Sequence, residues 1–147
     1  MNKQKTLDLF SFIRRKKVSI PMFFDNISAG FPSPATDYME NKLDLNEHLI
    51  KHPAATFIVK ASGFSMIGAG INSGDLLIID RSITPKNDNI VIASIFGDLT
   101  VKKLKKKKNT LFLISASDHY PSIEVKEEME CFIWGVVTFI IHATTTN

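Results

Sequence analysis

Residues 56–80 read TFIVKASGFSMIGAGINSGDLLIID, and this stretch decides the fold class. Its two ends, Thr56–Ala61 and Leu76–Asp80, are short apolar and β-branched runs of the kind that form strands. The glycines between them permit sharp changes of backbone direction. The stretch therefore predicts two strands joined by a loop, and Ser65 lies in a tight turn at the start of that loop.

Working outward from this stretch, the downstream sequence repeats the strand pattern four times between turn residues. The four runs are Ile90–Phe96, Leu99–Leu104, Leu111–Ser115 and Phe132–His142. Gly97-Asp98 predicts a hairpin turn, and Asn109 predicts a turn after the fourth strand. Upstream, Asp44 to His52 predicts one short helix that Pro53 ends. We expect a mostly antiparallel β domain with one small helix and no internal repeats.

Length and composition limit the class of protein. The 147 residues make one domain's worth of chain, and the single cysteine, Cys131, excludes an internal disulfide. The longest apolar stretch, Phe132 to Ile141, is about half the roughly 20 residues that a membrane-spanning helix needs. The apolar patch Leu7–Ile13 is followed, not preceded, by basic residues, unlike a secretory signal. We therefore expect a cytoplasmic protein.

The first 29 residues differ in charge from the remainder. They hold six basic and two acidic side chains, whereas residues 30–147 hold twelve basic and thirteen acidic ones. Leu7, Phe10 and Ile13 recur at helical spacing, so a short amphipathic helix is expected, followed by an extended linker from Pro21 to Pro34. This basic arm is too short for a helix-turn-helix module, so we expect no attached DNA-binding domain.

Two residues carry candidate chemistry, Ser65 and Lys102. A serine hydroxyl becomes a nucleophile when a base removes its proton, and lysine is such a base only when burial keeps it neutral. Alternation places Lys102 on the face of Leu104 and Lys103 on the other face, although both faces carry apolar neighbours. Gly63 permits a bend that points the backbone N–H groups near Phe64 and Ser65 at an oxyanion. From spacing alone, an exposed loop serine remains the commoner explanation.

Six separated segments resemble one family. They are residues 29–35 (AGFPSPA), 43–46 (LDLN), 49–53 (LIKHP), 59–66 (VKASGFSM), 74–80 (GDLLIID) and 100–104 (TVKKL). Together they closely resemble the UmuD family of LexA-type, self-processing serine peptidases. The resemblance covers about residues 25–142 and keeps the order and spacing of the segments.

The resemblance implies a curled, largely antiparallel β fold, and it assigns roles to residues. Ser65 matches the family's nucleophile, Lys102 rather than Lys103 matches its general base, and Ala29–Gly30 matches the bond that is cut. The cut divides an arm, residues 1–29, from a peptidase and dimerisation domain, residues 30–147.

The family's partners are also implied. Its members form homodimers, and a RecA filament on single-stranded DNA stimulates their self-cleavage after DNA damage. The trimmed form then joins a UmuC-type polymerase as its accessory subunit in translesion synthesis, within the SOS response. No cofactor is implied.

The chain departs from the family near the nucleophile. Phe64 stands where an acidic residue is frequent, and Gly68 stands where an aspartate is common. Ala29, in place of a frequent cysteine, is the residue found in LexA-type repressors. None of these changes removes a catalytic group, but Phe64 and Gly68 are expected to affect the loop and the rate.

Other readings remain open. A non-catalytic β module that dimerises and docks onto a polymerase or RecA is the competing class, and a membrane signal peptidase is disfavoured because the chain shows no anchor. The lysine run Lys102–Lys108 is read as a solvated hairpin tip, with direct DNA binding or an acidic partner as the alternative. His48 and His52 are read as surface histidines, so no metal is expected.

Overall fold

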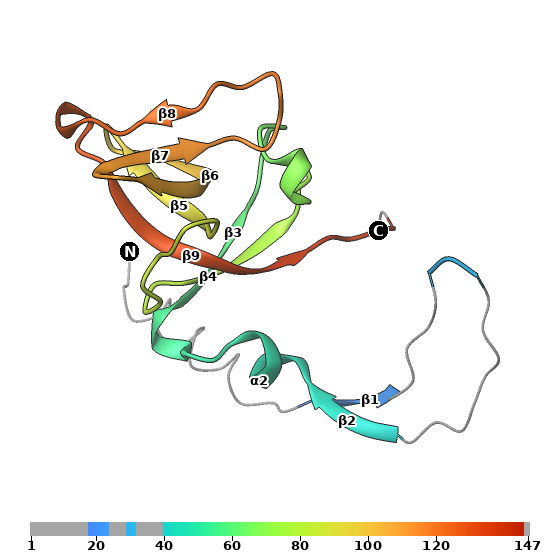
Figure 1. The fold of residues 1–147 in the computed structure, drawn as a ribbon. Helices are drawn as coiled ribbons and strands as arrows, with labels where there is room; N and C mark the ends of the chain where they lie inside the picture. Colours follow the sequence, from blue (N-terminus) through green and yellow to red (C-terminus); the bar gives the residue numbers. More distant parts are fainter. Residues whose placement is uncertain (1–17, 24–28, 32–39, 146–147) are drawn as a thin grey trace, which may run out of the picture. The chain divides into compact units, whose positions relative to one another are not determined.

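The computed structural model describes residues 18–23, 29–31 and 40–145 of the chain (Figure 1). The chain forms two compact units, Met1–Leu49 and Ile50–Asn147. The helix predicted around Leu7–Ile13 lies outside the described residues, as does most of the linker predicted from Pro21 to Pro34.

In the first unit, the described residues form a two-stranded antiparallel sheet and one helix. Strand β1 (Ser19–Phe23) pairs with β2 (Glu40–Asp44), and helix α2 (Leu45–Leu49) follows directly. The Oδ1 atom of Asp44 accepts the backbone N–H of Asn46 at 2.9 Å, which helps to begin the helix. The predicted helix is confirmed but ends three residues before His52. Strand β1 was not predicted, because Pro21 was read as part of a linker, whereas an edge strand accommodates proline.

The second unit is built on one seven-stranded sheet. Its strands are β3 (Thr56–Lys60), β4 (Leu76–Asp80), β5 (Ile90–Ile95), β6 (Asp98–Lys107), β7 (Thr110–Ile114), β8 (Ile123–Glu124) and β9 (Phe132–Ile141). Their order is β3-β4-β9-β5-β6-β7-β8, and every neighbouring pair is antiparallel. Over the residues that the structure describes, the mostly antiparallel β fold with one short helix is confirmed. Strand β8 was missed because two residues are too short to show alternation.

The sheet has a core on both of its faces. One cluster of buried side chains contains Leu77, Ile79 and Ile92, and the other contains Val91 and Leu113 together with their neighbours. Because successive side chains of a strand point to opposite faces, β5 contributes to both clusters. The long strand β9 curves across the sheet between β4 and β5 (Figure 1). This curvature gives the curled form that the family resemblance implied.

The turn between β5 and β6 lies one residue earlier than predicted. Ile95 pairs with Asp98, so Phe96 and Gly97 form a two-residue turn and Asp98 already belongs to β6. Their φ angles are +49° and +84°, and a tight hairpin turn of type I′ requires positive φ at both positions. Phe96 is thus held in a conformation that favours glycine, which sequence pattern alone did not indicate.

The other helical elements among the described residues are single turns. They are η1 (Pro53–Ala55), η2 (Ile67–Ala69) and η3 (Glu127–Met129). Turn η2 follows Ser65 closely, and its C-terminal residue Gly70 has a φ of +82°. In the part of the chain that the structure describes, no helix has the length and apolar character to cross a membrane.

Candidate active site

The loop that carries Ser65 is fixed at its base to the turn before β4. The N–H of Ala61 donates to the carbonyl of Asp75, and the N–H of Gly74 donates to the carbonyl of Ala61, both at 2.8 Å. Gly63 then adopts a φ of +88°, a conformation that glycine reaches at little cost. The bend predicted at Gly63 is confirmed, and it directs the chain toward Ser65.

The other side of the loop is held by Ala116, which lies just beyond β7. Its N–H donates to the carbonyl of Ser65 at 2.8 Å, and its carbonyl accepts the N–H of Gly68 at 2.7 Å. A Cβ atom at position 68 would lie 2.4 Å from that carbonyl oxygen, so the approach requires glycine. Glycine at position 68, where the family commonly has an aspartate, therefore fits the packing of this chain. Sequence reasoning did not identify Ala116, since no motif surrounds it.

Lys102 reaches Ser65 from strand β6. Its Nζ atom lies 3.0 Å from the Oγ atom of Ser65, although 37 residues separate them. Lys102 pairs with Val91 across the strands and shares its face with Leu104, and it is only 7% exposed. Lys103 lies on the other face and is half-buried. Burial and contact thus distinguish the two lysines, which alternation alone left open.

Burial also sets the charge state of this lysine. Removal from water disfavours the ammonium form and lowers the pKa of Lys102 from its ordinary value of 10.5. The neutral amine can accept a proton from a hydroxyl at hydrogen-bond distance, whereas an ammonium group cannot. The pair therefore has the geometry and the electrostatics that a serine nucleophile with a lysine base requires.

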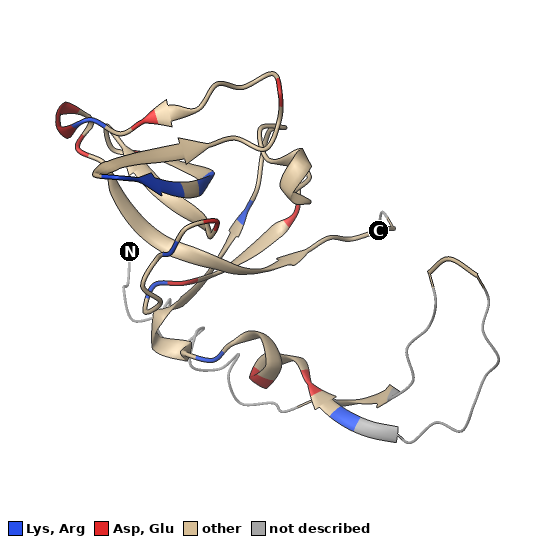
Figure 2. Cartoon of the chain, viewed as in Figure 1, with Lys and Arg blue, Asp and Glu red and all other residues tan. Residues whose placement is uncertain are grey.

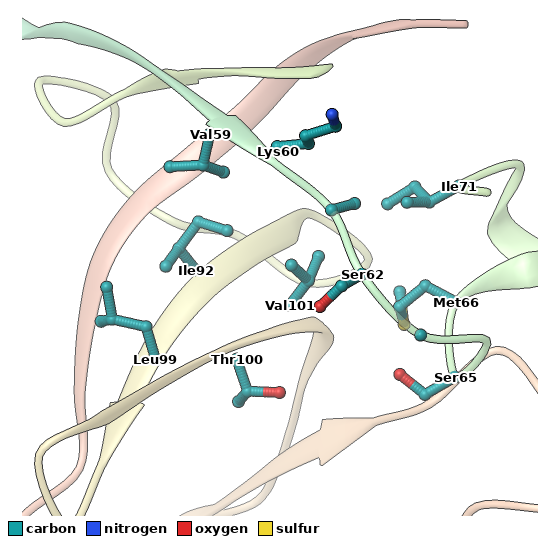
Figure 3. Close-up of a pocket in the computed structure, with 12 residues that line it drawn as sticks. Val59, Lys60, Ser62, Ser65, Met66, Ile71, Ile92, Leu99, Thr100 and Val101 are labelled. Carbon is teal, nitrogen blue, oxygen red and sulfur yellow. The ribbon is translucent and has the colours of Figure 1, made fainter. Parts of the chain in front are cut away.

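A cavity of about 230 Å³ adjoins the serine (Figure 3). Its apolar walls are formed by side chains from β3, β5 and β6, namely Val59, Ile92, Leu99 and Val101. The hydroxyl groups of Ser62, Ser65 and Thr100 face the same space in the close-up (Figure 3). Such a hollow, apolar with a few polar groups, suits an extended peptide with small or aliphatic side chains.

The backbone near Phe64 is the region in which an oxyanion site was predicted. Within the described residues, no hydrogen bond occupies the N–H group of Phe64 or of Ser65, so both can donate to a developing oxyanion. The Phe64 side chain is 59% exposed and does not fill the cavity. The structure therefore brings Gly63, Phe64, Ser65 and Lys102 into one place, in the second unit.

The predicted cleavage residues lie elsewhere in the chain. Ala29 and Gly30 belong to the first unit, and both are exposed. Exposure is what a segment needs if it is to enter a peptidase site in an extended form. That this bond is the one cut remains a prediction.

Two histidine–aspartate pairs flank the strand β4, and sequence reasoning did not find them. His142 Nδ1 lies 2.6 Å from Asp75 Oδ1, and His52 Nδ1 lies 2.5 Å from Asp80 Oδ2. Both carboxylates are buried. The backbone N–H of Asn72, and then His142, lower the pKa of Asp75. Burial alone would raise the pKa of Asp80, but the hydrogen bonds that it accepts, from Ser82 and from His52, lower it.

These two pairs make hydrogen bonds that hold the structure, and they are not arranged as metal ligands. Asp75 also accepts the N–H of Asn72 at 2.8 Å, so it holds the turn against which the serine loop is fixed. Among the described residues, no three His, Cys, Asp or Glu side chains gather in a way that would hold a metal ion.

Comparison with known proteins places the chain in a family. The Peptidase S24-like family model matches residues 21–138, which include the serine, the lysine and most of the seven-stranded sheet. The chain therefore belongs to the Peptidase S24-like family.

Relatives of known name agree with this placement. The chain is 49% identical to Protein ImpA of Escherichia coli over 125 residues, which are 84% of each chain. It is 46% identical to Protein SamA of Salmonella typhimurium, over 86% of this chain and 88% of that protein. It is also 32% identical to the LexA repressor of Pectobacterium carotovorum, over 88% of this chain but only 63% of the repressor.

Proposed function

We propose that the protein is a UmuD-like, self-cleaving serine peptidase that cuts its own Ala29–Gly30 bond. Ser65 is the nucleophile and Lys102 is the general base. The observation that carries the proposal is the 3.0 Å approach of the buried Lys102 Nζ to Ser65 Oγ. Membership of the Peptidase S24-like family and similarity to the LexA repressor and to Protein ImpA support it.

The first half of the reaction is acyl transfer. Neutral Lys102 removes the Ser65 hydroxyl proton as Oγ attacks the carbonyl carbon of Ala29. The backbone N–H groups of Phe64 and Ser65 stabilise the resulting oxyanion. The lysine ammonium then returns the proton to the Gly30 nitrogen as the peptide bond breaks. The products are an ester between Ala29 and Ser65 and a new amino terminus at Gly30.

The second half is hydrolysis of that ester. Lys102, neutral again, takes a proton from a water molecule as its oxygen attacks the ester carbon. The proton returns to Ser65 Oγ, and residues 1–29 leave with a free carboxylate. Residues 1–29 hold six basic and two acidic side chains and residues 30–147 hold twelve and thirteen, so the trimmed chain has a formal charge of opposite sign to the arm.

The partners follow from the same proposal. A homodimer is the working form, a RecA filament on single-stranded DNA stimulates cleavage, and the trimmed product is the accessory subunit of a UmuC-type translesion polymerase in the SOS response. The setting would be the cytoplasm. Docking of the arm is the control point, because tethering gives the bond a high effective concentration only when the arm is docked.

The two adjacent lysines provide a matched test. Purified Lys102→Ala should not release residues 1–29, with or without RecA filaments on single-stranded DNA, whereas Lys103→Ala should cleave at near the wild-type rate. Both variants remove one lysine from the same strand, so a loss confined to Lys102 reports the chemistry rather than the charge. Equal activity of the two variants would contradict the role of Lys102 and favour the non-catalytic binding module.

A further inference from the structure

The hairpin formed by β6 and β7 carries the densest positive charge of the second unit. Six of the seven residues from Lys102 to Lys108 are lysines, and Lys102 is directed to the serine. Of the others, Lys106, Lys107 and Lys108 are exposed and Lys103 and Lys105 are half-buried. The blue of basic residues is concentrated on β6 and the turn that follows it (Figure 2). The proposed self-cleavage uses only the first of these six side chains.

Strand register sorts the lysines between two faces. Lys103 pairs with Ile114 and Lys105 pairs with Phe112, so these four side chains share one face, together with Lys107. The opposite face carries the buried pair of Leu104 and Leu113, and beyond it Lys106. The two faces therefore differ in kind. Toward the hairpin tip, one combines three lysines with a half-buried aromatic ring, whereas the other carries the buried pair of leucines.

We propose that the first face, defined by Lys103, Lys105, Lys107 and Phe112, binds single-stranded nucleic acid. Alternate residues of a strand are about 6.8 Å apart, which is close to the spacing of successive phosphates along an extended strand. The lysines contact the phosphates, and the Phe112 ring receives a base by stacking. Lysines beside an aromatic ring on a sheet are the combination that recognises unpaired bases.

The aromatic ring favours this ligand over the alternatives. A duplex conceals the faces of its bases, so a sheet face could contact only its phosphates and Phe112 would contribute nothing. An acidic polypeptide would likewise need the lysines but not the ring. On the far side of Phe112, Glu124 of β8 is exposed and would repel phosphates, so the bound strand follows β6 rather than β8.

One carboxylate competes for this surface. Asp88 Oδ1 lies 3.2 Å from Lys105 Nζ, and the Asp88 side chain is well exposed. Among the described residues, this is the one ion pair between a lysine of Lys102–Lys108 and an acidic side chain. Asp88 has a φ of +70°, a conformation that asparagine also adopts readily. Asp88→Asn should therefore release Lys105 without disturbing the backbone, and binding should tighten two- to five-fold.

The test is fluorescence anisotropy of a labelled oligothymidylate of about 20 nucleotides, titrated with the full chain over a series of salt concentrations. Two double variants remove the same charge: Lys105→Gln with Lys107→Gln on the proposed face, and Lys106→Gln with Lys108→Gln on the opposite face and in the turn that follows β6. The first should weaken binding tenfold or more. It should also reduce the salt slope, the steepness with which the logarithm of the affinity falls with the logarithm of salt concentration, by about 1.4, since each phosphate contact on a single strand contributes about 0.7. The second should weaken binding less than threefold.

Phe112→Leu tests the ring separately. It should weaken binding about 5- to 50-fold with the salt slope unchanged, because stacking is not an ionic contact. Thermal unfolding checks that each variant is folded. If Phe112→Leu does not fold, the two double lysine variants and Asp88→Asn test the proposal. Equal losses from the two double variants, tighter binding to duplex than to single strand, or equal binding of polyglutamate would each overturn the proposal. The readout is binding, so it stands or falls independently of self-cleavage.

Discussion

Replacement of Gly68 by alanine should destabilise the protein, although the same change usually does the opposite. Gly68 has no positive φ, and at such a position Gly→Ala ordinarily stabilises a fold by about 0.4–1 kcal/mol through the unfolded chain. Here the new Cβ would lie 2.4 Å from the Ala116 carbonyl oxygen, well inside the 3.0 Å that Cβ atoms keep. The backbone must move by about 0.6 Å or more, and strain of this kind costs about 1–3 kcal/mol.

The displacement reaches the nucleophile, because the same Ala116 residue donates its N–H to the Ser65 carbonyl. We expect a net loss of about 1–2 kcal/mol, a fall in Tm of about 3–6 °C and self-cleavage slower by about 10- to 100-fold. Thermal unfolding and intact mass after timed incubation at alkaline pH measure the two effects.

The carbonyl group, not the Ala116 side chain, is the obstacle, so Ala116→Gly should not rescue Gly68→Ala. The Cβ atom of Ala116 would lie at an ordinary contact distance of 3.5 Å from the Cβ atom added at position 68. Rescue by Ala116→Gly would show that the side chains clash instead. A Gly68→Ala protein as stable and as active as the wild type would refute the argument that Ala116 positions Ser65.

Three further outcomes are expected. The self-cleavage rate should rise with pH and reach half its maximum below pH 10.5, because burial lowers the pKa of Lys102 and only the neutral amine accepts a proton; a flat pH–rate profile would contradict this. In His142→Ala the pKa of Asp75 should rise. A carboxyl group whose pKa is lowered in the folded state stabilises the fold above pH 3.8, and this stabilisation is lost as the pH falls. Acid unfolding of His142→Ala, followed by circular dichroism, should therefore begin at a higher pH than that of the wild type, whereas His119→Ala should unfold at the wild-type pH. Gly97→Ala, at a φ of +84°, should lower stability by about 1 kcal/mol in urea unfolding without slowing cleavage by the folded protein; unchanged stability would argue against the turn.

Local pattern predicted most of the second unit because its strands obey local rules. Leu76–Asp80 was predicted at its observed bounds, since a continuous apolar run between turn residues can bury both faces of a strand. The face of Lys102 followed from alternation with Leu104. Strand β6 continues three residues further than predicted, to Lys107, because lysines on a hairpin extend into solvent while their backbone stays paired with β7.

Contacts that join distant residues could not be read from the sequence. His142 meets Asp75 across 67 residues, and Ala116 meets Ser65 without any motif around it. Such partners are set by how the sheet curls, and neither periodicity nor spacing encodes that curvature. The 3.0 Å approach of Lys102 to Ser65 was expected from the family resemblance, whereas spacing alone left a solvated loop serine as the commoner reading.

The central claim is that Ser65, activated by Lys102, cuts the Ala29–Gly30 bond of its own chain. The most direct measurement is the intact mass of purified wild-type protein and of Ser65→Ala, after incubation at neutral and alkaline pH and with RecA filaments on single-stranded DNA. The account predicts a product consisting of residues 30–147 in the wild type, more of it at alkaline pH, and none in Ser65→Ala. Cleavage at another bond, or the same product from Ser65→Ala, would contradict it, as would wild-type protein that stays intact under every condition.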